Sequence, residues 1–434
     1  MPILIQIILS VYFVSFFLFA QKDLRLGVYA VIFLLGTYLV RFSVLGIPTT
    51  ALELMIYSLV AAYLWRERGR LSVREDIANF FREDKLFAWG IVLLLAGVVS
   101  STFFSSDIRT SLGILKGWFV DPLLLLAVYL KVIETRAQAQ NSLLVLMASA
   151  AAVSLIALVY LLGGELTFDG RLRAFYESPN YLAMYVAPGL IVAVYAFVLQ
   201  KLSSYQRFDI PDILRSGAVR ITLLAILSGV LYLTKSYGAI LGVFTAVSLF
   251  LIRGAVRGRI AFDGRRKRML VVSALGVLAV FSILSVQKYS QIIDSNERSS
   301  LHSRLMIWNA SVLMLEDSPV FGIGPGTFQE TYLAYQERFP VPYLEWAVAE
   351  PHNTLLAFYL QAGLLGLAGF LLVLVSLLRK ARTDDVFFLF LAYFLIHGLV
   401  DTLYWKNDLS VIFFLFAGAA IVCGRSIDKN GKIV

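Results

Sequence analysis

The stretch that decides the fold is "NTLLAFYLQAGLLGLAGFLLVLVSLL", residues 353–378, which contains no charged side chain. About 20 apolar residues suffice for an α-helix to cross the hydrocarbon core of a bilayer. Comparable runs recur along the chain, and hydrophobic residues make up 59% of its 434 residues. Soluble domains contain about 45–50% of such residues. The sequence therefore predicts an all-α polytopic membrane protein, because lipid offers the backbone no hydrogen-bond partners of its own.

The apolar runs predict about twelve or thirteen transmembrane helices, of which the first two are short enough to form a bent hairpin. The runs lie near residues 3–20, 26–41, 49–65, 86–103, 113–131, 142–162, 181–199, 219–234, 238–252, 270–286, 353–378, 386–403 and 409–423. One long hydrophilic segment interrupts them. We therefore expect one integral membrane domain with N-terminal helices in 1–286, a loop with short amphipathic helices in 287–352, and C-terminal helices with a tail in 353–434.

Basic residues indicate how the helices are oriented. Lysine and arginine are concentrated in residues 66–85, 253–268 and 379–382 and in the C-terminal tail. These stretches fall on one side if the runs alternate, and that side is predicted to be cytoplasmic. The loop 287–352 and the N-terminus are then outside. The net charge of +9 thus follows from topology, and we predict no nucleic-acid partner.

Ionisable residues within the predicted spans lie toward their outer ends. These residues are Glu53, Asp121, Lys235, His397 and Asp401. Charged groups in a membrane are costly and usually functional, and transporters more often hold them near the midplane. The pattern therefore predicts chemistry at the outer surface. His397 and Asp401 are four residues apart, so we expect them to share a helix face and hydrogen-bond to each other as a structural pair.

A histidine lies at the junction of the hydrophilic segment 287–352 and the apolar run 353–378, in "AEPHNTLL", residues 349–356. Pro351 suits the first turn of a helix with Glu350 as its N-cap, which places His352 in that turn. The helix dipole there favours a neutral imidazole, and a neutral imidazole can act as a general base. Alternatively, His352 and Asn353 only satisfy free N–H groups at the helix start, and spacing alone favours this interpretation.

A pair of cations precedes the helix predicted to start near residue 179. In "RLRAFYESPNYLA" (171–183), Ser178 and Pro179 are typical of an N-cap and a first helical residue. Arg171 and Arg173 flank this helix start, and a helix N-terminus beside guanidinium groups suits a diphosphate. Anchoring to lipid phosphates explains the same arginines equally well.

Two further stretches carry cations on the outer side. Lys235 lies in a tight turn between spans, where it either binds an anion or extends toward the interface, and the second interpretation is favoured. Arg304 and Trp308 share one face of a predicted amphipathic helix over 303–317. The glycine-rich stretch that follows lacks the Gly-Lys-Ser/Thr of a nucleotide-binding loop. No cluster of histidine, cysteine and carboxylates has metal-ligand spacing, and the single Cys423 excludes an internal disulfide, so we predict no metal and no cofactor.

Four stretches in this order resemble the consecutive motifs of the O-antigen ligase and polymerase superfamily. They are "RLRAFYESPNYLA", "LTKSYGAILG", "SRLMIWNASVLMLEDSPVFGIGPGTF" and "PHNTLLAFYLQAGLLG", and the resemblance covers about residues 40–425. It implies a glycosyltransferase of the bacterial cytoplasmic membrane that works at the outer face, in lipopolysaccharide or other cell-envelope polysaccharide biosynthesis. The implied donor is an undecaprenyl-diphosphate-linked glycan, and no metal or nucleotide sugar is implied.

The resemblance also implies roles for individual residues. His352 matches the histidine that deprotonates the acceptor hydroxyl. Arg171, Arg173 and Arg304 match diphosphate-binding arginines, and Lys235 stands one residue before the serine of a motif that usually supplies another arginine. Ala174 stands where a glycine is frequent. Residues expected to support these groups are Asn180, Trp308, Asn353, His397 and Asp401.

The acceptor stays open at this point. A ligase uses a lipid A core sugar, a polymerase uses a growing glycan on a second carrier, and a protein oligosaccharyltransferase uses a Ser or Thr hydroxyl. The moderate loop 287–352 without an added soluble domain favours a ligase, with a polymerase as the close alternative. A transporter of lipid-linked glycans is the alternative from another class, and a purely structural membrane scaffold is a further one.

Overall fold

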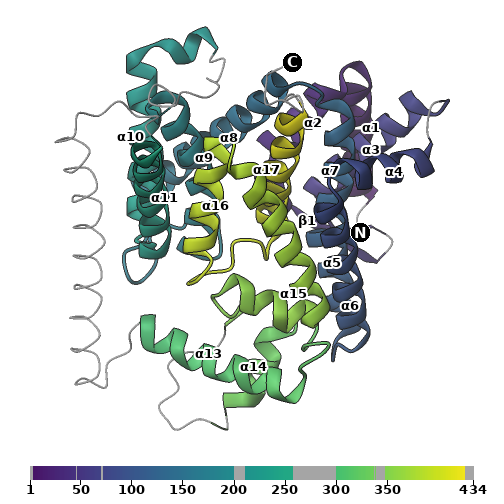
Figure 1. Cartoon of the computed structure of the whole chain (residues 1–434), viewed down its shortest axis with the longest axis vertical. Coiled ribbons are helices and arrows are strands. Elements are labelled where there is room, and N and C mark those ends of the chain that lie inside the picture. Colours follow the sequence, from purple (N-terminus) through teal and green to yellow (C-terminus); the bar gives the residue numbers. More distant parts are fainter. Residues whose placement is uncertain are drawn as a thin grey trace.

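The computed structural model describes residues 3–44, 46–69, 72–199, 211–257, 300–336, 338 and 348–425. It confirms an all-α polytopic membrane protein (Figure 1). Within the described residues, seven helices are long and apolar enough to cross a membrane, and four apolar helices are shorter, at 10–17 residues. The span predicted at residues 270–286 lies outside the described residues, as does most of the basic stretch 253–268.

The N-terminal elements alternate long apolar helices with short connections. They are α1 (Ile3–Lys22), α2 (Leu24–Phe33), η1 (Leu35–Leu39), β1 (Arg41–Val44), β2 (Ile47–Thr50), α3 (Ala51–Glu67), α4 (Val73–Glu83), α5 (Lys85–Phe103), α6 (Ile108–Ile114), η2 (Leu115–Val120), α7 (Asp121–Val132) and α8 (Arg136–Leu162). The later elements are α9 (Pro179–Phe197), η4 (Asp212–Arg215), α10 (Gly217–Leu233), α11 (Tyr237–Val256), α13 (Ser300–Asp317), α14 (Phe328–Gln336), α15 (Thr354–Ala381), α16 (Asp385–His397) and α17 (Asn407–Arg425).

A small hairpin interrupts the second apolar run. The run near 26–41 was predicted as one span, but α2 ends at Phe33 and the chain continues through η1 into β1. Strand β1 pairs antiparallel with β2, with Arg41 opposite Thr50. Thr50 then caps α3 in a capping box with Glu53. The run is therefore not one span, and its apolar composition did not indicate that the chain turns after α2 and continues through β1 and β2 to the start of α3.

Helices α5 and α15 pack with their backbones in close approach. A Cβ atom added at Gly97 would lie 2.1 Å from the backbone nitrogen of Gly366, and one added at Gly369 would lie 2.2 Å from that of Leu94. Small residues permit this approach, which is the common way for membrane helices to associate. Helix α17 passes through the core and buries nearly all of its side chains. These contacts position the part of α15 that carries Gly366 and Gly369.

Helix α15 is broken in the middle, at Gly363, where φ is +68°. The break frees backbone groups, and the glycine-rich loop after α13 satisfies them. The N–H of Ile323 donates to the carbonyl of Leu360 at 2.7 Å, and the N–H of Leu364 donates to the carbonyl of Val320 at 2.9 Å. The run 353–378 is thus two helices rather than one continuous span, because buried backbone must find partners within the protein. Figure 1 shows α13 and α14 together at one end of the molecule, beside this bend.

The described ends of the predicted basic stretches contact neighbouring parts of the chain. Arg253 donates to the carbonyls of Ala381 and Arg382. Lys380 lies 3.0 Å from Asp84, and Arg425 pairs with Glu83. The C-terminal end of α17, which carries Arg425, lies at the opposite end of the molecule from α13 and α14 (Figure 1). The polar residues of the candidate site therefore belong to the other end of the bundle.

Candidate functional site

His352 lies just before α15 in a left-handed backbone conformation, with φ at +49°. The N-cap of α15 is Asn353, whose Oδ1 accepts a hydrogen bond from the N–H of Leu356 at 3.0 Å. The prediction that Glu350 caps the helix and that His352 lies in its first turn is therefore wrong. Asn353 is the N-cap instead, and the His352 side chain contacts another residue.

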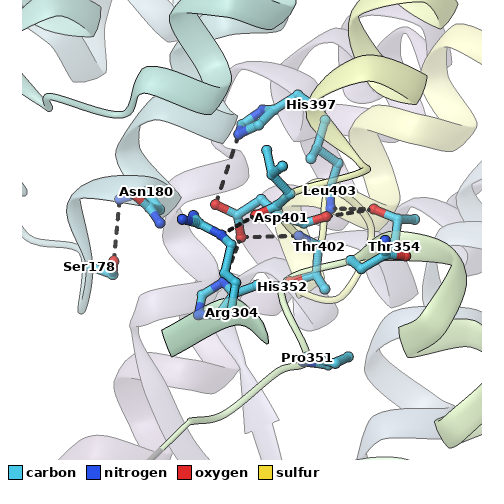
Figure 2. Close-up of polar contacts among 12 residues, drawn as sticks. Ser178, Asn180, Arg304, Pro351, His352, Thr354, His397, Asp401, Thr402 and Leu403 are labelled. Carbon is cyan, nitrogen blue, oxygen red and sulfur yellow. Dashed lines mark hydrogen bonds and ion pairs between the residues drawn. The ribbon is translucent and has the colours of Figure 1, made fainter. Parts of the chain in front are cut away.

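That residue is Asp401, in the turn between α16 and α17. Nδ1 of His352 lies 3.2 Å from Oδ1 of Asp401. The Asp401 side chain is almost fully buried, whereas that of His352 is 31% exposed. The carboxylate accepts a hydrogen bond only from the tautomer that carries its proton on Nδ1, which leaves the lone pair on Nε2 able to accept a proton. Figure 2 shows the two side chains facing each other.

The charge of Asp401 is set by its surroundings. Burial raises the pKa of this carboxyl, but the hydrogen bond from His352 and the electrostatic effects of His352, His397 and Arg304 outweigh burial and hold the pKa at about 2. Oδ1 of Asp401 also accepts from the N–H of Thr402 at 3.1 Å, and its backbone carbonyl accepts from Thr354 Oγ1 at 2.9 Å. Asp401 is thus an ionised, well-anchored partner for the imidazole.

His397 occupies a neighbouring position without the predicted hydrogen bond. Helix α16 ends at His397, although the run near 386–403 was predicted as one span. Nε2 of His397 lies 3.8 Å from Oδ2 of Asp401, which is beyond hydrogen-bond distance. Its Nδ1 instead contacts the hydroxyl of Tyr393 at 2.9 Å. The predicted direct hydrogen bond between His397 and Asp401 is therefore wrong, and Nε2 of His397 has no hydrogen-bond partner among the described residues.

Helix α13 contacts the segments next to both members of the pair. Nε of Arg304 donates to the carbonyl of Val400 at 3.0 Å, and Nε1 of Trp308 donates to the carbonyl of Pro351 at 3.0 Å. Arg304 thereby lies beside the turn that carries Asp401, as Figure 2 shows. The helix predicted over 303–317 thus contacts both the segment that carries His352 and the segment that carries Asp401.

Arg171 approaches the same site from the loop before α9. Its Nε donates to the carbonyl of Thr234 at 2.8 Å, and its Nη2 donates to Oδ1 of Asn180 at 2.5 Å. Burial lowers the pKa of Arg171, and Arg304 lowers it further, whereas Asp169 and Asp401 act in the opposite direction. The two arginines are therefore near enough to repel each other. A doubly charged anion between them would relieve that repulsion.

The start of α9 follows the prediction. Ser178 is the N-cap, its Oγ accepts from the N–H of Asn180 at 3.2 Å, and Pro179 is the first helical residue. Asn180 thus connects the helix N-terminus to Arg171. Arg173 is exposed. Its side chain is therefore accessible from outside the protein.

Backbone strain marks the same region. In the described part of the chain, the non-glycine residues with positive φ are Ala174, Lys235 and His352. Nζ of Lys235 donates to the carbonyl of Asp169 at 3.3 Å, in the loop that carries Arg171. Left-handed non-glycine residues are costly and cluster at functional sites. Ala174 stands where the resemblance leads one to expect glycine, and its φ of +51° gives the physical reason for that glycine.

The ionisable residues at the outer ends of the predicted spans form two groups. Asp401, His397 and Lys235 belong to the site around His352. Glu53 instead pairs with Lys116 at 2.6 Å. Asp121 accepts from the hydroxyl of the nearby Tyr57 at 2.8 Å. Sequence position alone did not separate these groups, because it does not reveal which outer ends adjoin.

Two residues that sequence reasoning missed also face the site. Glu350 is buried, and its Oε2 accepts from Nε2 of Gln361 at 2.6 Å. Lys406 is buried with its Nζ 3.2 Å from the ring centroid of Tyr181 and 3.5 Å from Oε2 of Glu177. A carboxylate two positions before a candidate base was the available signal for Glu350. Nothing local in the sequence singled out Lys406.

The described residues contain no group of three or more His, Cys, Asp or Glu side chains that could hold a metal ion. Metal independence of the reaction stays a prediction, which a chelator can test.

Comparison with known proteins finds a family model that is similar to part of the chain. Residues 222–371 match a family model described as O-antigen ligase. No curated protein matches the chain. The matched region contains Lys235, Arg304, Trp308, His352 and Asn353, and the geometry above adds Arg171 and Asp401 from outside it. This match supports the resemblance of the chain to the O-antigen ligase superfamily.

Proposed function

We propose that the chain is a membrane glycosyltransferase that transfers a glycan from an undecaprenyl-diphosphate carrier to an acceptor hydroxyl. The observation that carries this proposal is the His352–Asp401 pair, which lies within electrostatic reach of Arg304 and Arg171. A base beside a cationic site is what the reaction needs, because one substrate must lose a proton while the other leaves as an anion.

Each group has a defined task in the proposed step. Nε2 of His352 takes the proton of the acceptor hydroxyl, and the acceptor oxygen forms a bond to the anomeric carbon. The bond between that carbon and the phosphate oxygen breaks, and its electron pair leaves with undecaprenyl diphosphate. Asp401 stabilises the imidazolium that forms. General-base assistance of this kind contributes about 10²–10⁴ in rate.

The cations act on the leaving group. Arg171 and Arg304, with Lys235 and the exposed Arg173, bind the diphosphate and stabilise the negative charge that grows on it as the bond breaks. Within the described residues Nη1 of Arg171 donates no hydrogen bond, so this N–H group is available to a phosphate oxygen. A direct displacement inverts the anomeric centre of the donor sugar.

We place this site at the outer face of the bacterial cytoplasmic membrane. The support is the gathering of the basic loop ends at the opposite end of the bundle, since such loops are retained in the cytoplasm. The proposed acceptor is a lipid A core sugar or another cell-surface hydroxyl, as for a ligase. Polymerisation, with a carrier-linked glycan as acceptor, is the alternative within the same superfamily.

The test is glycan transfer by the purified full-length protein in detergent. A native undecaprenyl-diphosphate glycan is supplied with lipid A core, with a second carrier-linked glycan, or with a Ser/Thr peptide. We expect transfer by the wild type with and without a chelator, inversion of the anomeric configuration, and loss of transfer in His352→Ala and Arg304→Ala. The preferred acceptor then separates ligase from polymerase. Movement of the carrier across proteoliposomes without transfer to any acceptor would instead identify a transporter.

A further inference from the structure

Glu350 is a buried carboxyl group two residues before His352, and the proposed reaction gives it no task so far. The residue is 6% exposed. Its Oε2 accepts from Nε2 of Gln361 at 2.6 Å, and Oε1 of Gln361 accepts from the N–H of Gly326 at 2.8 Å. This chain of hydrogen bonds links the segment before His352 to the first half of α15 and to the glycine-rich loop that fills the break in α15.

The groups facing Glu350 come from several elements. Gln361 on α15 is neutral. Tyr181 on α9 lies with its ring centroid 3.2 Å from Nζ of Lys406. Asp401 and Lys406 both come from the turn between α16 and α17, and they act on Glu350 with opposite signs. Lys406 lies within ion-pair distance of Glu177 instead, and within the described residues no cation lies within ion-pair distance of Glu350.

These surroundings favour the neutral acid. A buried carboxylate without a paired cation is costly, so such a group keeps its proton. Burial raises the pKa of Glu350, Asp401 raises it further, and Gln361 and Lys406 lower it, with the result that the pKa lies at about 8. Glu350 is therefore protonated at neutral pH while Asp401 is ionised. Loss of the Glu350 proton would place a second negative charge beside Asp401.

We propose that Glu350 is a positioning residue that acts through His352 and supports transfer only while it is protonated. In this form it holds the Pro351–His352 turn against Gln361 without a competing charge. When ionised, it repels Asp401 and pulls on the turn whose other anchors are the Trp308–Pro351 hydrogen bond and the cap at Asn353. The inference rests on the proposed function, because the affected step is proton transfer to His352.

The experiment compares pH profiles of transfer for the purified full-length wild type and Glu350→Gln. Glutamine has the shape of the neutral acid, still offers an oxygen to Gln361, and does not ionise. We expect similar rates for both proteins near neutral pH. Near pH 9 the wild type should be about tenfold slower than near pH 7, as one inhibitory ionisation requires, whereas Glu350→Gln should keep its rate.

Two results overturn the inference while leaving the proposed function intact. Equal alkaline declines in both proteins would assign the ionisation to another group. A folded Glu350→Gln protein that is slow at every pH would show that the carboxylate itself is needed. Failure of the wild type to transfer to any acceptor would be a different result, because it would overturn the proposed function and this inference together.

Thermal unfolding adds a readout that does not depend on activity. The folded-state pKa of Glu350 is raised, so its contribution to stability is complete below the unfolded value near 4.5 and is lost as pH rises toward about 8. The Tm of Glu350→Gln minus that of the wild type should therefore increase across this window. A constant difference would show that Glu350 is already ionised in the folded protein and would overturn the inference.

Discussion

Nδ1 of His352 lies 3.2 Å from Oδ1 of Asp401, although 49 residues separate them in the chain. The imidazole is presented by the start of α15, and the carboxylate by the turn after α16. Trp308 and Arg304 on α13 hold the two segments in place through backbone carbonyls. The pair therefore depends on three elements packing together, and its function can be tested by changing each member.

Replacing the imidazole should abolish the base without unfolding the site. We expect His352→Asn to lower the transfer rate by about 10²–10⁴. Asparagine tolerates the left-handed backbone at this position better than most residues, so the variant should keep its Tm and its affinity for the donor. Rates, donor binding and Tm would be measured together. A His352→Asn protein with the wild-type rate would remove the base from the mechanism.

Asp401→Asn should lower kcat and leave the KM for the donor nearly unchanged, since the carboxylate orients and stabilises the imidazole. The pKa of Asp401 is depressed to about 2, so the stability it contributes is present above the unfolded value near 3.8 and lost only as pH falls through about 2. The Tm deficit of Asp401→Asn should therefore persist between about pH 5 and pH 8. A variant as stable as the wild type throughout this range would contradict an ionised Asp401.

Arg171 and Arg304 should contribute more to donor binding than Arg173. Arg171→Lys loses the two-nitrogen contact with Thr234 and Asn180, and a hydrogen bond involving a charged group is worth about 1.5–3 kcal/mol. We expect at least about a tenfold higher KM for the donor, and a similar change for Arg304→Lys. The exposed Arg173 is the matched comparison, and Arg173→Ala should have a smaller effect. The reverse ranking would relocate the diphosphate to Arg173.

Ala174→Gly should stabilise the protein by about 1 kcal/mol, because a left-handed conformation is strained for alanine and free of that strain for glycine. The matched control is Ala148→Gly on α8, where glycine in a helix interior should cost about 0.5–1 kcal/mol. Tm values in detergent would show opposite shifts. A loss of stability in both variants would contradict the strain at Ala174.

Gly363→Ala should be strongly destabilising. Its φ is +68°, and an added Cβ would lie 2.6 Å from the carbonyl oxygen of Val320, which accepts the hydrogen bond from Leu364. The same substitution at Gly113 is the control, because a Cβ there meets nothing within 4 Å. Detergent-solubilised yield and Tm would be compared. A normal Tm for Gly363→Ala would show that the break in α15 does not depend on this glycine.

Much of the architecture was predictable from local sequence. Apolar runs of bilayer length indicated a polytopic helical protein, because a helix forms all of its backbone hydrogen bonds within itself and lipid offers no other partners. Ser178 and Pro179 predicted the start of α9 because capping depends on residues a few positions apart. The same local rule misplaced Glu350 as a cap. A proline beside two polar residues is compatible with more than one helix start. Asn353 becomes the N-cap because the backbone turns at His352, directly before it.

What the sequence by itself determined is therefore the class of fold, the apolar runs that become helices, and the residue types available for chemistry at one end of the bundle. Hydropathy and capping act over a few residues, so these features are encoded locally. The tertiary structure alone decided that His352 faces Asp401, that Glu53 and Asp121 belong to a separate group, and that α15 breaks at Gly363 against the loop after α13. Each of these depends on contacts between segments far apart in the chain, where the packing of helices selects one pairing among many that the sequence permits.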